Sequence, residues 1–284
     1  MADLSGISWT KSTFNPWMVC QRISPACEHC YAETLVTNRM GYNGRRLPIL
    51  WGPRGERKVT SDANWRNPVK WNAEAAKTGE FWPVFCASLA DVFEDRRELD
   101  APRERLFRLI EETPHLTWLL LTKRIDRVND LKPARWIWFP DHVGIGTTVE
   151  SQRYLDERLP VLQTINAKTR WLSIEPQIEA IEYGEQMLAV DWAITGGESG
   201  PGCRPYDPQW ASDLIAAGRR FGFAPFVKQL GEAWARTNKS SQRHGAEPLD
   251  WAPALRVQEF PRGLTTARLA AKAGVPLPLF PYAR

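Results

Sequence analysis

The chain has few cysteines, and they do not form the even-numbered set that a disulfide framework needs. Only five occur among 284 residues; Cys20, Cys27 and Cys30 lie close together, while Cys86 and Cys203 are isolated. A chain of this length in which 43% of the residues are hydrophobic has enough core to fold without disulfides. We therefore expect a reducing compartment and a cytoplasmic location.

Long apolar runs are also missing. Nowhere do about eighteen apolar residues follow one another, and the first residues, MADLSGISWTKS, lack the apolar segment of a signal peptide. The sequence thus predicts neither export nor a membrane span, and we expect no membrane partner.

From about residue 81, short apolar runs alternate with amphipathic stretches. The runs that predict strands are residues 83–87, 116–121, 142–146, 170–174, 190–195 and 224–227. Helices are predicted for APRERLFRLIEETP, SQRYLDERLPVLQTI and DPQWASDLIAAGRRFG, the last with Asp207 as its cap and Pro208 at its first position. This alternation is typical of an α/β fold, and we expect a partial or irregular (β/α) barrel of mainly parallel strands.

The predicted barrel domain covers residues 1–235. Within it, residues 37–80 lack the strand–helix rhythm and form an expected insertion after the first helix. Residues 236–284 are polar and then rich in proline, so we expect a peripheral, partly disordered C-terminal extension.

Polar side chains follow all six predicted strands. Active sites of (β/α) barrels lie at the carboxyl ends of the strands, so these side chains predict one large polar pocket. Polar residues also end strands because loops are wet, which is the plainer explanation of one or two such ends. The candidate pocket residues are Ser88, Asp91, Lys123, Glu150, Ser173, Glu175, Gly196, Gly197, Glu198 and Lys228.

The loop CQRISPACEHCYAE concentrates three of the thiols. Three thiolates can ligate three irons of a 4Fe–4S cluster and leave the fourth iron open to a second molecule. Zinc is the main alternative, but it prefers four ligands, and Cys20 would have to pair with His29 or Cys203. Buried, unligated thiols are a third possibility. We favour the cluster, held by Cys20, Cys27 and Cys30.

Seven ordered motifs between about residues 6 and 235 resemble the phage-type three-Cys-motif proteins, a poorly characterised family. They are SWTKSTFNPWMVCQRISPACEHCYAE, SLADVFED, LTKR, GTTVES, SIEP, ITGGESGPGCRP and FVKQLGE. That family is similar in layout to radical S-adenosylmethionine enzymes such as spore photoproduct lyase. The usual spacing there is C-x3-C-x2-C, whereas six residues separate Cys20 from Cys27 here, and His29 replaces the aromatic residue before the last cysteine.

The resemblance implies two cofactors, a 4Fe–4S cluster and S-adenosyl-L-methionine. Reductive cleavage of S-adenosylmethionine by the reduced cluster would yield a 5'-deoxyadenosyl radical. The resemblance also implies an electron donor such as flavodoxin or ferredoxin. By position, Glu150 and Ser173 would bind the ribose hydroxyls of S-adenosylmethionine, and Ser88 and Asp91 its amino group. Four residues are then assigned to the substrate side as catalytic candidates: Lys123, Glu175, Glu198 and Lys228.

GGESG follows the fifth predicted strand. Gly196 and Gly197 can let backbone N–H groups approach a ligand, although a simple turn explains them equally well. The full GxGxxG fingerprint is absent. We assign both glycines to cofactor binding because Glu198 lies within the same turn.

Basic residues outnumber acidic ones by nine to four between Arg39 and Glu80, and tryptophans lie among them. Aromatic faces beside cations suit single-stranded nucleic acid, but a solvated basic loop with packed tryptophans explains the pattern equally well. The candidate nucleic-acid residues are Arg45, Arg46, Trp51, Arg57, Lys58 and Trp65. We expect DNA or a nucleotide derivative as substrate, for modification or repair of a base. The alternative is a zinc-stabilised, non-enzymatic nucleic-acid-binding protein.

Overall fold

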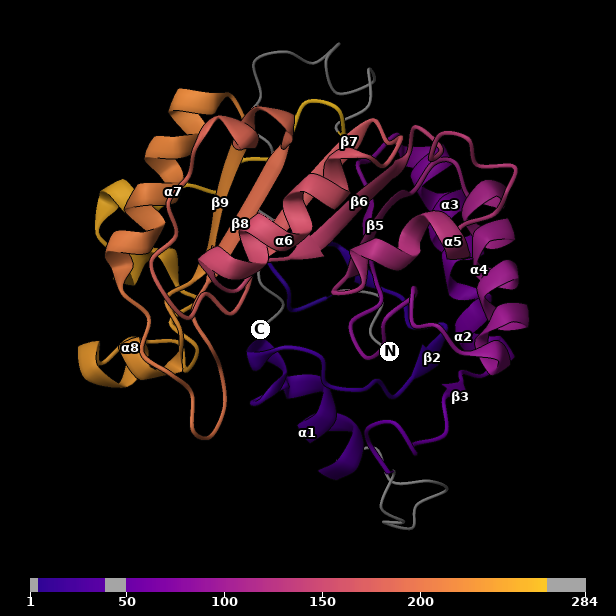
Figure 1. Cartoon of the computed structure of the whole chain (residues 1–284), viewed down its shortest axis with the longest axis horizontal. Helices are drawn as coiled ribbons and strands as arrows, with labels where there is room; N and C mark the ends of the chain where they lie inside the picture. Colours follow the sequence, from indigo (N-terminus) through magenta and orange to yellow (C-terminus); the bar gives the residue numbers. More distant parts are fainter. Residues whose placement is uncertain (1–4, 39–49, 265–284) are drawn as a thin grey trace.

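A computed structural model describes residues 5–38 and 50–264 (Figure 1). Its main feature is one seven-stranded, all-parallel sheet in the order β1-β4-β5-β6-β7-β8-β9, an open (β/α) half barrel. The strands are β1 (Ser12–Thr13), β4 (Pro83–Cys86), β5 (Thr117–Thr122), β6 (Val143–Thr148), β7 (Thr169–Ile174), β8 (Trp192–Gly196) and β9 (Ala224–Gln229). All six predicted strands and the predicted fold class are confirmed.

Helices flank the sheet (Figure 1). The longer ones are α3 (Asn67–Thr78), α4 (Asp100–Glu112), α6 (Gln152–Gln163) and α7 (Pro208–Phe221). As predicted, α7 begins after Asp207, whose carboxylate accepts a hydrogen bond of 2.9 Å from the Gln209 N–H. It ends at Gly222, where a φ of 85° is in the left-handed region that glycine adopts freely.

Shorter elements make up the rest of the regular structure within the described residues. The helices are α1 (Tyr31–Asn38), α2 (Asp62–Trp65), α5 (Val128–Leu131) and α8 (Glu232–Asn238), and β2 (Trp17–Met18) pairs antiparallel with β3 (Lys58–Val59). Six 3-10 turns are η1 (Pro25–Cys27), η2 (Arg97–Leu99), η3 (Ile125–Arg127), η4 (Glu185–Ala189), η5 (Pro248–Asp250) and η6 (Pro253–Leu255). Among the described helices, none is both long enough and apolar enough to cross a membrane.

Both faces of the sheet are buried, which explains its near-continuous apolar strands. Alternate strand residues such as Trp118 and Leu172 pack in one core with the helices. The intervening residues, among them Trp171, Trp192 and Phe226, join Trp9 and Phe85 in a second, mainly aromatic cluster. Within it, the Trp171 and Trp192 ring centroids lie 5.5 Å apart.

The described part of the C-terminal extension packs along the edge strand β9. The Val227 N–H donates to the Val257 carbonyl over 2.8 Å, and the Glu259 N–H donates to Pro225 over 3.1 Å. Trp251 and Leu264 are buried. The extension is therefore packed against the barrel at least as far as residue 264, and the rest of the predicted extension, residues 265–284, lies outside the described residues.

Candidate functional site

The cysteine loop, residues 19–31, crosses the carboxyl end of the half barrel. On one side the Val19 N–H donates to the Leu89 carbonyl over 3.1 Å, and the Tyr31 hydroxyl donates to the Ser88 carbonyl over 2.9 Å, just after β4. On the other side, His29 Nδ1 lies 2.9 Å from Glu198 Oε2, just after β8. The loop is therefore fastened above strand ends that are far apart in the sequence, and α1 continues from it (Figure 1).

Cys30 lies directly before the first residue of α1. Burial raises the pKa of its thiol, while hydrogen bonds from the Glu33 and Ala32 N–H groups and the charge of Lys123 lower that pKa. Free N–H groups at a helix N-terminus stabilise a thiolate. Burial is the larger effect, so the pKa of Cys30 lies above its usual value, while the N–H groups and Lys123 favour the thiolate form that a bound metal would require.

Cys20 lies against a guanidinium. Arg124 Nη1, at the end of β5, is 3.7 Å from the Cys20 sulfur. Burial and the charge of Asp91 raise the pKa of Cys20 to about 12, and Arg124 opposes that rise. Without a bound metal, Cys20 is therefore a neutral thiol at pH 7.

Cys27 is buried in η1, with its sulfur 3.8 Å from Ser24 Oγ. Within residues 5–38 and 50–264, no three His, Cys, Asp or Glu side chains converge on one point where a metal ion could sit. Thiolates that ligate separate irons of a cluster have no need to converge on one point. The donor set, three thiols on one loop with a helix N-terminus and a guanidinium beside two of them, fits an iron–sulfur cluster.

Glu198 fastens the cysteine loop. Its carboxylate accepts hydrogen bonds from Arg204 Nε over 3.0 Å and from the Arg204 N–H over 2.8 Å, besides its contact with His29. Burial alone would raise the pKa of Glu198, but the hydrogen bonds from Arg204 and His29 bring it below its usual value. Arg204 also donates to the Pro25 carbonyl over 3.2 Å. The predicted substrate-side carboxylate is thus occupied in holding the loop.

Glu175 and Lys228, two of the predicted substrate-side residues, form an ion pair. They lie after β7 and in β9, and Lys228 Nζ is 3.0 Å from Glu175 Oε1. Gly196 borders this pair, because a Cβ there would lie 2.7 Å from the same carboxylate oxygen. Tyr31 is nearby: burial raises its pKa, and the charges of Cys30 and Glu175 add to the rise.

The cofactor candidates occupy two different environments. Asp91 is saturated: its oxygens accept from the Thr122 hydroxyl at 2.7 Å, the Arg124 guanidinium at 2.9 Å and two backbone N–H groups. Glu150 is fully buried, and its Oε2 accepts from Arg158 at 2.9 Å. Among the described residues its Oε1 is a buried acceptor without a donor, and the neighbouring Ser173 is also buried.

The two remaining cofactor candidates have structural explanations. Ser88 Oγ accepts a hydrogen bond of 2.9 Å from the Asn15 side chain. A Cβ on Gly197 would lie 2.7 Å from the Leu230 carbonyl oxygen, so glycine is required here for close backbone approach.

The nucleic-acid candidates are not gathered on one surface. Trp65 is 4% exposed and packs against Phe14, with ring centroids 5.3 Å apart. Arg57 is 5% exposed, and its Nε donates to Glu94 over 2.8 Å. These two residues are corrected to structural positions: interleaving along the sequence indicated exposure, but packing buries both. Trp51 and Lys58 are half-buried, and Arg45 and Arg46 lie outside the described residues.

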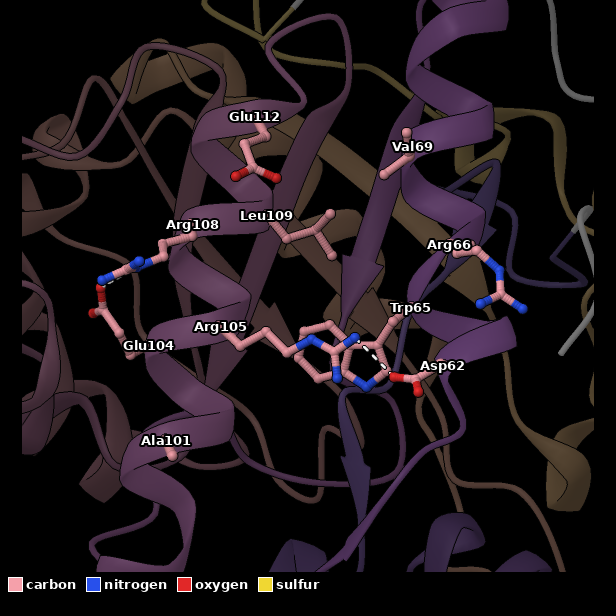
Figure 2. A pocket seen from close by; sticks show the side chains of 10 residues that line it. All are labelled: Asp62, Trp65, Arg66, Val69, Ala101, Glu104, Arg105, Arg108, Leu109 and Glu112. Atoms are coloured by element: carbon pink, nitrogen blue, oxygen red, sulfur yellow. Dashed lines mark hydrogen bonds and ion pairs between the residues drawn. The ribbon is translucent and has the colours of Figure 1, made fainter.

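A groove of about 740 Å³ lies between α2, α3 and α4 (Figure 2), and none of its lining residues belongs to the cysteine loop. In it the Arg105 guanidinium stacks 4.2 Å from the Trp65 ring and pairs with Asp62 over 2.9 Å. None of its lining residues belongs to the strand ends.

Sequence reasoning did not select Arg124 or Arg204 and considered His29 only as a zinc ligand, although all three contact the cysteine loop or Glu198. The signal was present, because each lies within a quoted motif: LTKR, ITGGESGPGCRP and the cysteine loop itself.

A family model described as "Protein of unknown function (DUF5131)" matches residues 4–255. No curated protein matches the sequence. Among solved structures, a cysteine-to-alanine mutant of spore photoproduct lyase with dinucleoside spore photoproduct is similar at 15% identity and a TM-score of 0.44, over 74% of each chain. A double mutant of the same enzyme with bound AdoMet is similar at 15% identity and a TM-score of 0.45, over 76% of this chain and 75% of that chain. The citrate synthase SbnG is similar at 15% identity and a TM-score of 0.31, over 72% of this chain and 86% of that chain.

Proposed function

The chain belongs to the family described as proteins of unknown function DUF5131, and we propose that it is a radical S-adenosylmethionine enzyme. One observation carries the proposal: three thiols share a loop fastened over the carboxyl end of a parallel half barrel. That end is where (β/α) barrels place their chemistry.

Cys20, Cys27 and Cys30 would hold a 4Fe–4S cluster. Such a cluster, once reduced by one electron, supplies the electron that cleaves S-adenosylmethionine and yields a 5'-deoxyadenosyl radical. The protein's residues would bind and orient S-adenosylmethionine and shield the site from water. The unpartnered Oε1 of Glu150 would accept a ribose hydroxyl, and the loop fastened by Glu198 would exclude water. Lys123, Glu175 and Lys228 are the proposed substrate-side charges.

The zinc alternative is not favoured, because a single zinc ion needs ligands that converge on one point, and within the described residues no three His, Cys, Asp or Glu side chains do so.

Nucleic acid is the proposed substrate class. The support is compositional: the excess of basic residues between residues 39 and 80, of which Lys58 is half-buried and Arg45 and Arg46 lie outside the described residues. A base in a duplex would have to be extruded to reach a buried radical, which costs a few kcal/mol. Modification or repair of a base is the proposed reaction.

The test is the product of S-adenosylmethionine cleavage. Anaerobic protein that is reduced with dithionite and given S-adenosylmethionine should release 5'-deoxyadenosine, and Cys27→Ala and Cys30→Ala should abolish the release. Cys203→Ala is the matched control and should keep it, because this thiol contacts Arg236 instead of the cysteine loop. Equal release from all four proteins, or none from a wild type that carries a cluster, contradicts the proposal.

A further inference from the structure

Arg124 makes three kinds of contact from one buried guanidinium. Nη1 lies 3.7 Å from the Cys20 sulfur and 2.9 Å from Asp91 Oδ2, and Nη2 donates to the Gln21 carbonyl over 3.2 Å. The residue is only 8% exposed. It therefore fixes both the side chain of Cys20 and the backbone beside it.

Three other buried charges, Asp91, Glu94 and Arg57, hold Arg124 in place. Asp91 binds it directly, Glu94 Oε1 lies 3.8 Å from its Nη2, and Arg57 binds Glu94 through Nε over 2.8 Å. Arg57 Nη1 also donates to the Gly52 carbonyl over 2.9 Å, and the Gly52 N–H donates to the Cys20 carbonyl over 3.0 Å. Cys20 is thus held from the side chain and from the backbone by one network.

The charges around Cys20 oppose one another. The carboxylates of Asp91 and Glu94 disfavour negative charge on the sulfur, and the guanidinium of Arg124 favours it. Hydrogen bonds and positive charge at a ligand sulfur stabilise the more negative, reduced form of an iron–sulfur cluster. Removing Arg124 would leave the Asp91 carboxylate beside the ligand without its guanidinium partner, whereas Glu94 would keep Arg57.

We propose that Arg124 is a positioning residue that orients Cys20 as a cluster ligand and raises the reduction potential of the cluster. The inference rests on the proposed function. A lysine keeps the charge of Arg124 but lacks the planar fork that reaches sulfur, carbonyl and carboxylate together. Comparing lysine with glutamine at position 124 therefore separates the effect of the positive charge from the effect of the guanidinium geometry.

The experiment is an EPR-monitored titration of anaerobic, cluster-loaded protein, in which dithionite and mediators deliver one electron to each cluster. Arg124→Gln should lower the midpoint potential, so that the ratio of reduced to oxidised cluster at the wild-type midpoint falls at least tenfold, which corresponds to about 59 mV. Arg124→Lys should lower the midpoint potential by a smaller amount.

Arg103→Gln is the matched control. Arg103 is equally buried and binds the same segment, donating from Nε to the Val92 carbonyl over 2.9 Å, but no contact joins it to the cysteine loop within the described residues. It should lose stability and keep the wild-type potential.

Iron loss from Arg124→Gln alone, with cluster retained in Arg124→Lys and Arg103→Gln, also supports the role. An unchanged potential in Arg124→Gln, or equal iron loss in all three variants, overturns it. A wild type that binds no iron overturns the proposed function instead, so the two failures are distinguishable.

Discussion

At the scale of single residues, Glu198 joins the cysteine loop to the end of β8 through both of its carboxylate oxygens. Oε2 contacts His29 and Arg204, and Oε1 accepts a hydrogen bond of 2.5 Å from Arg204 Nη2. A buried acceptor with several charged donors stabilises the folded state only while it is ionised. The position of the loop over the barrel should therefore depend on this charge.

Replacing Glu198 by glutamine should destabilise the protein by roughly 1–3 kcal/mol at pH 7, because hydrogen bonds to a charged group are removed. The folded-state pKa of Glu198 lies below its unfolded value of about 4.3, so its contribution is complete above that pH. The contribution is lost as the pH falls through the folded pKa. Urea unfolding between pH 3 and 7 should show the difference from wild type shrinking toward low pH.

Glu157→Gln is the control for that experiment. Glu157 forms an exposed pair with Arg153 within α6, which is worth only about 0.3–0.5 kcal/mol. A Glu198→Gln difference that stays constant across the pH range would show that the charge of Glu198 contributes nothing.

The sequence could place the site residues but not their partners. Glu175 and Lys228 were predicted from strand ends, and the parallel sheet brings them within 3.0 Å. Asp91 was selected by the same pattern, yet besides the local Phe93 N–H its carboxylate accepts from donors that are 31 to 33 residues away in sequence. Which lone pairs remain open depends on tertiary contacts that no local pattern encodes.

At the scale of elements, β6 carries two glycines that face the aromatic cluster. A Cβ on Gly146 would lie 2.3 Å from the Trp171 ring, whereas a Cβ on Gly144 would meet its nearest atom at 3.3 Å. Gly146 thus makes room for the indole of Trp171 on the neighbouring strand β7. At Gly144, a small shift of the Leu119 side chain would make room for an added Cβ.

Gly146→Ala should therefore cost about 1–3 kcal/mol or more, because a rigid ring cannot move out of a packed core. Gly144→Ala, on the same face of the same strand, should cost less than about 1 kcal/mol. The midpoints of urea unfolding measure both. Equal costs would show that Trp171 does not determine the sequence at Gly146.

Strands of four to six residues were predictable, and the two-residue β1 was not. Apolar runs followed by polar ends marked β4 to β9 in the sequence, since strands buried on both faces are nearly all apolar. Ser12 and Thr13 of β1 form no such run and pair with β4 through the backbone. Trp65 was misjudged for a related reason: its neighbours in sequence are charged, but its neighbours in space are Phe14 and Arg105.

At the scale of the whole molecule, the formal net charge is only +4, and the segment between Arg39 and Glu80 accounts for that excess. Arg57 is buried and paired with Glu94, so it is not available to contact phosphate. The remaining candidates for phosphate contacts are Arg45, Arg46 and Lys58.

DNA binding should therefore weaken steeply with salt. Charge reversal at Arg45, Arg46 and Lys58 should reduce the slope of log K against log salt by about 0.9 for each phosphate group that the protein no longer neutralises. Arg153→Glu, on the exposed side of α6, is the control and should leave the slope unchanged. If DNA does not bind even at low salt, the substrate is a small molecule or a peptide held by Lys123, Glu175 and Lys228.

The central claim is that three cysteines on one loop hold a cluster in this protein. The most direct measurement is the iron, sulfide and zinc content of anaerobically purified protein, together with its EPR spectrum after reduction. We predict about four irons and four sulfides for each chain and a reduced-cluster signal that changes when S-adenosylmethionine is added. Stoichiometric zinc without iron would contradict the account.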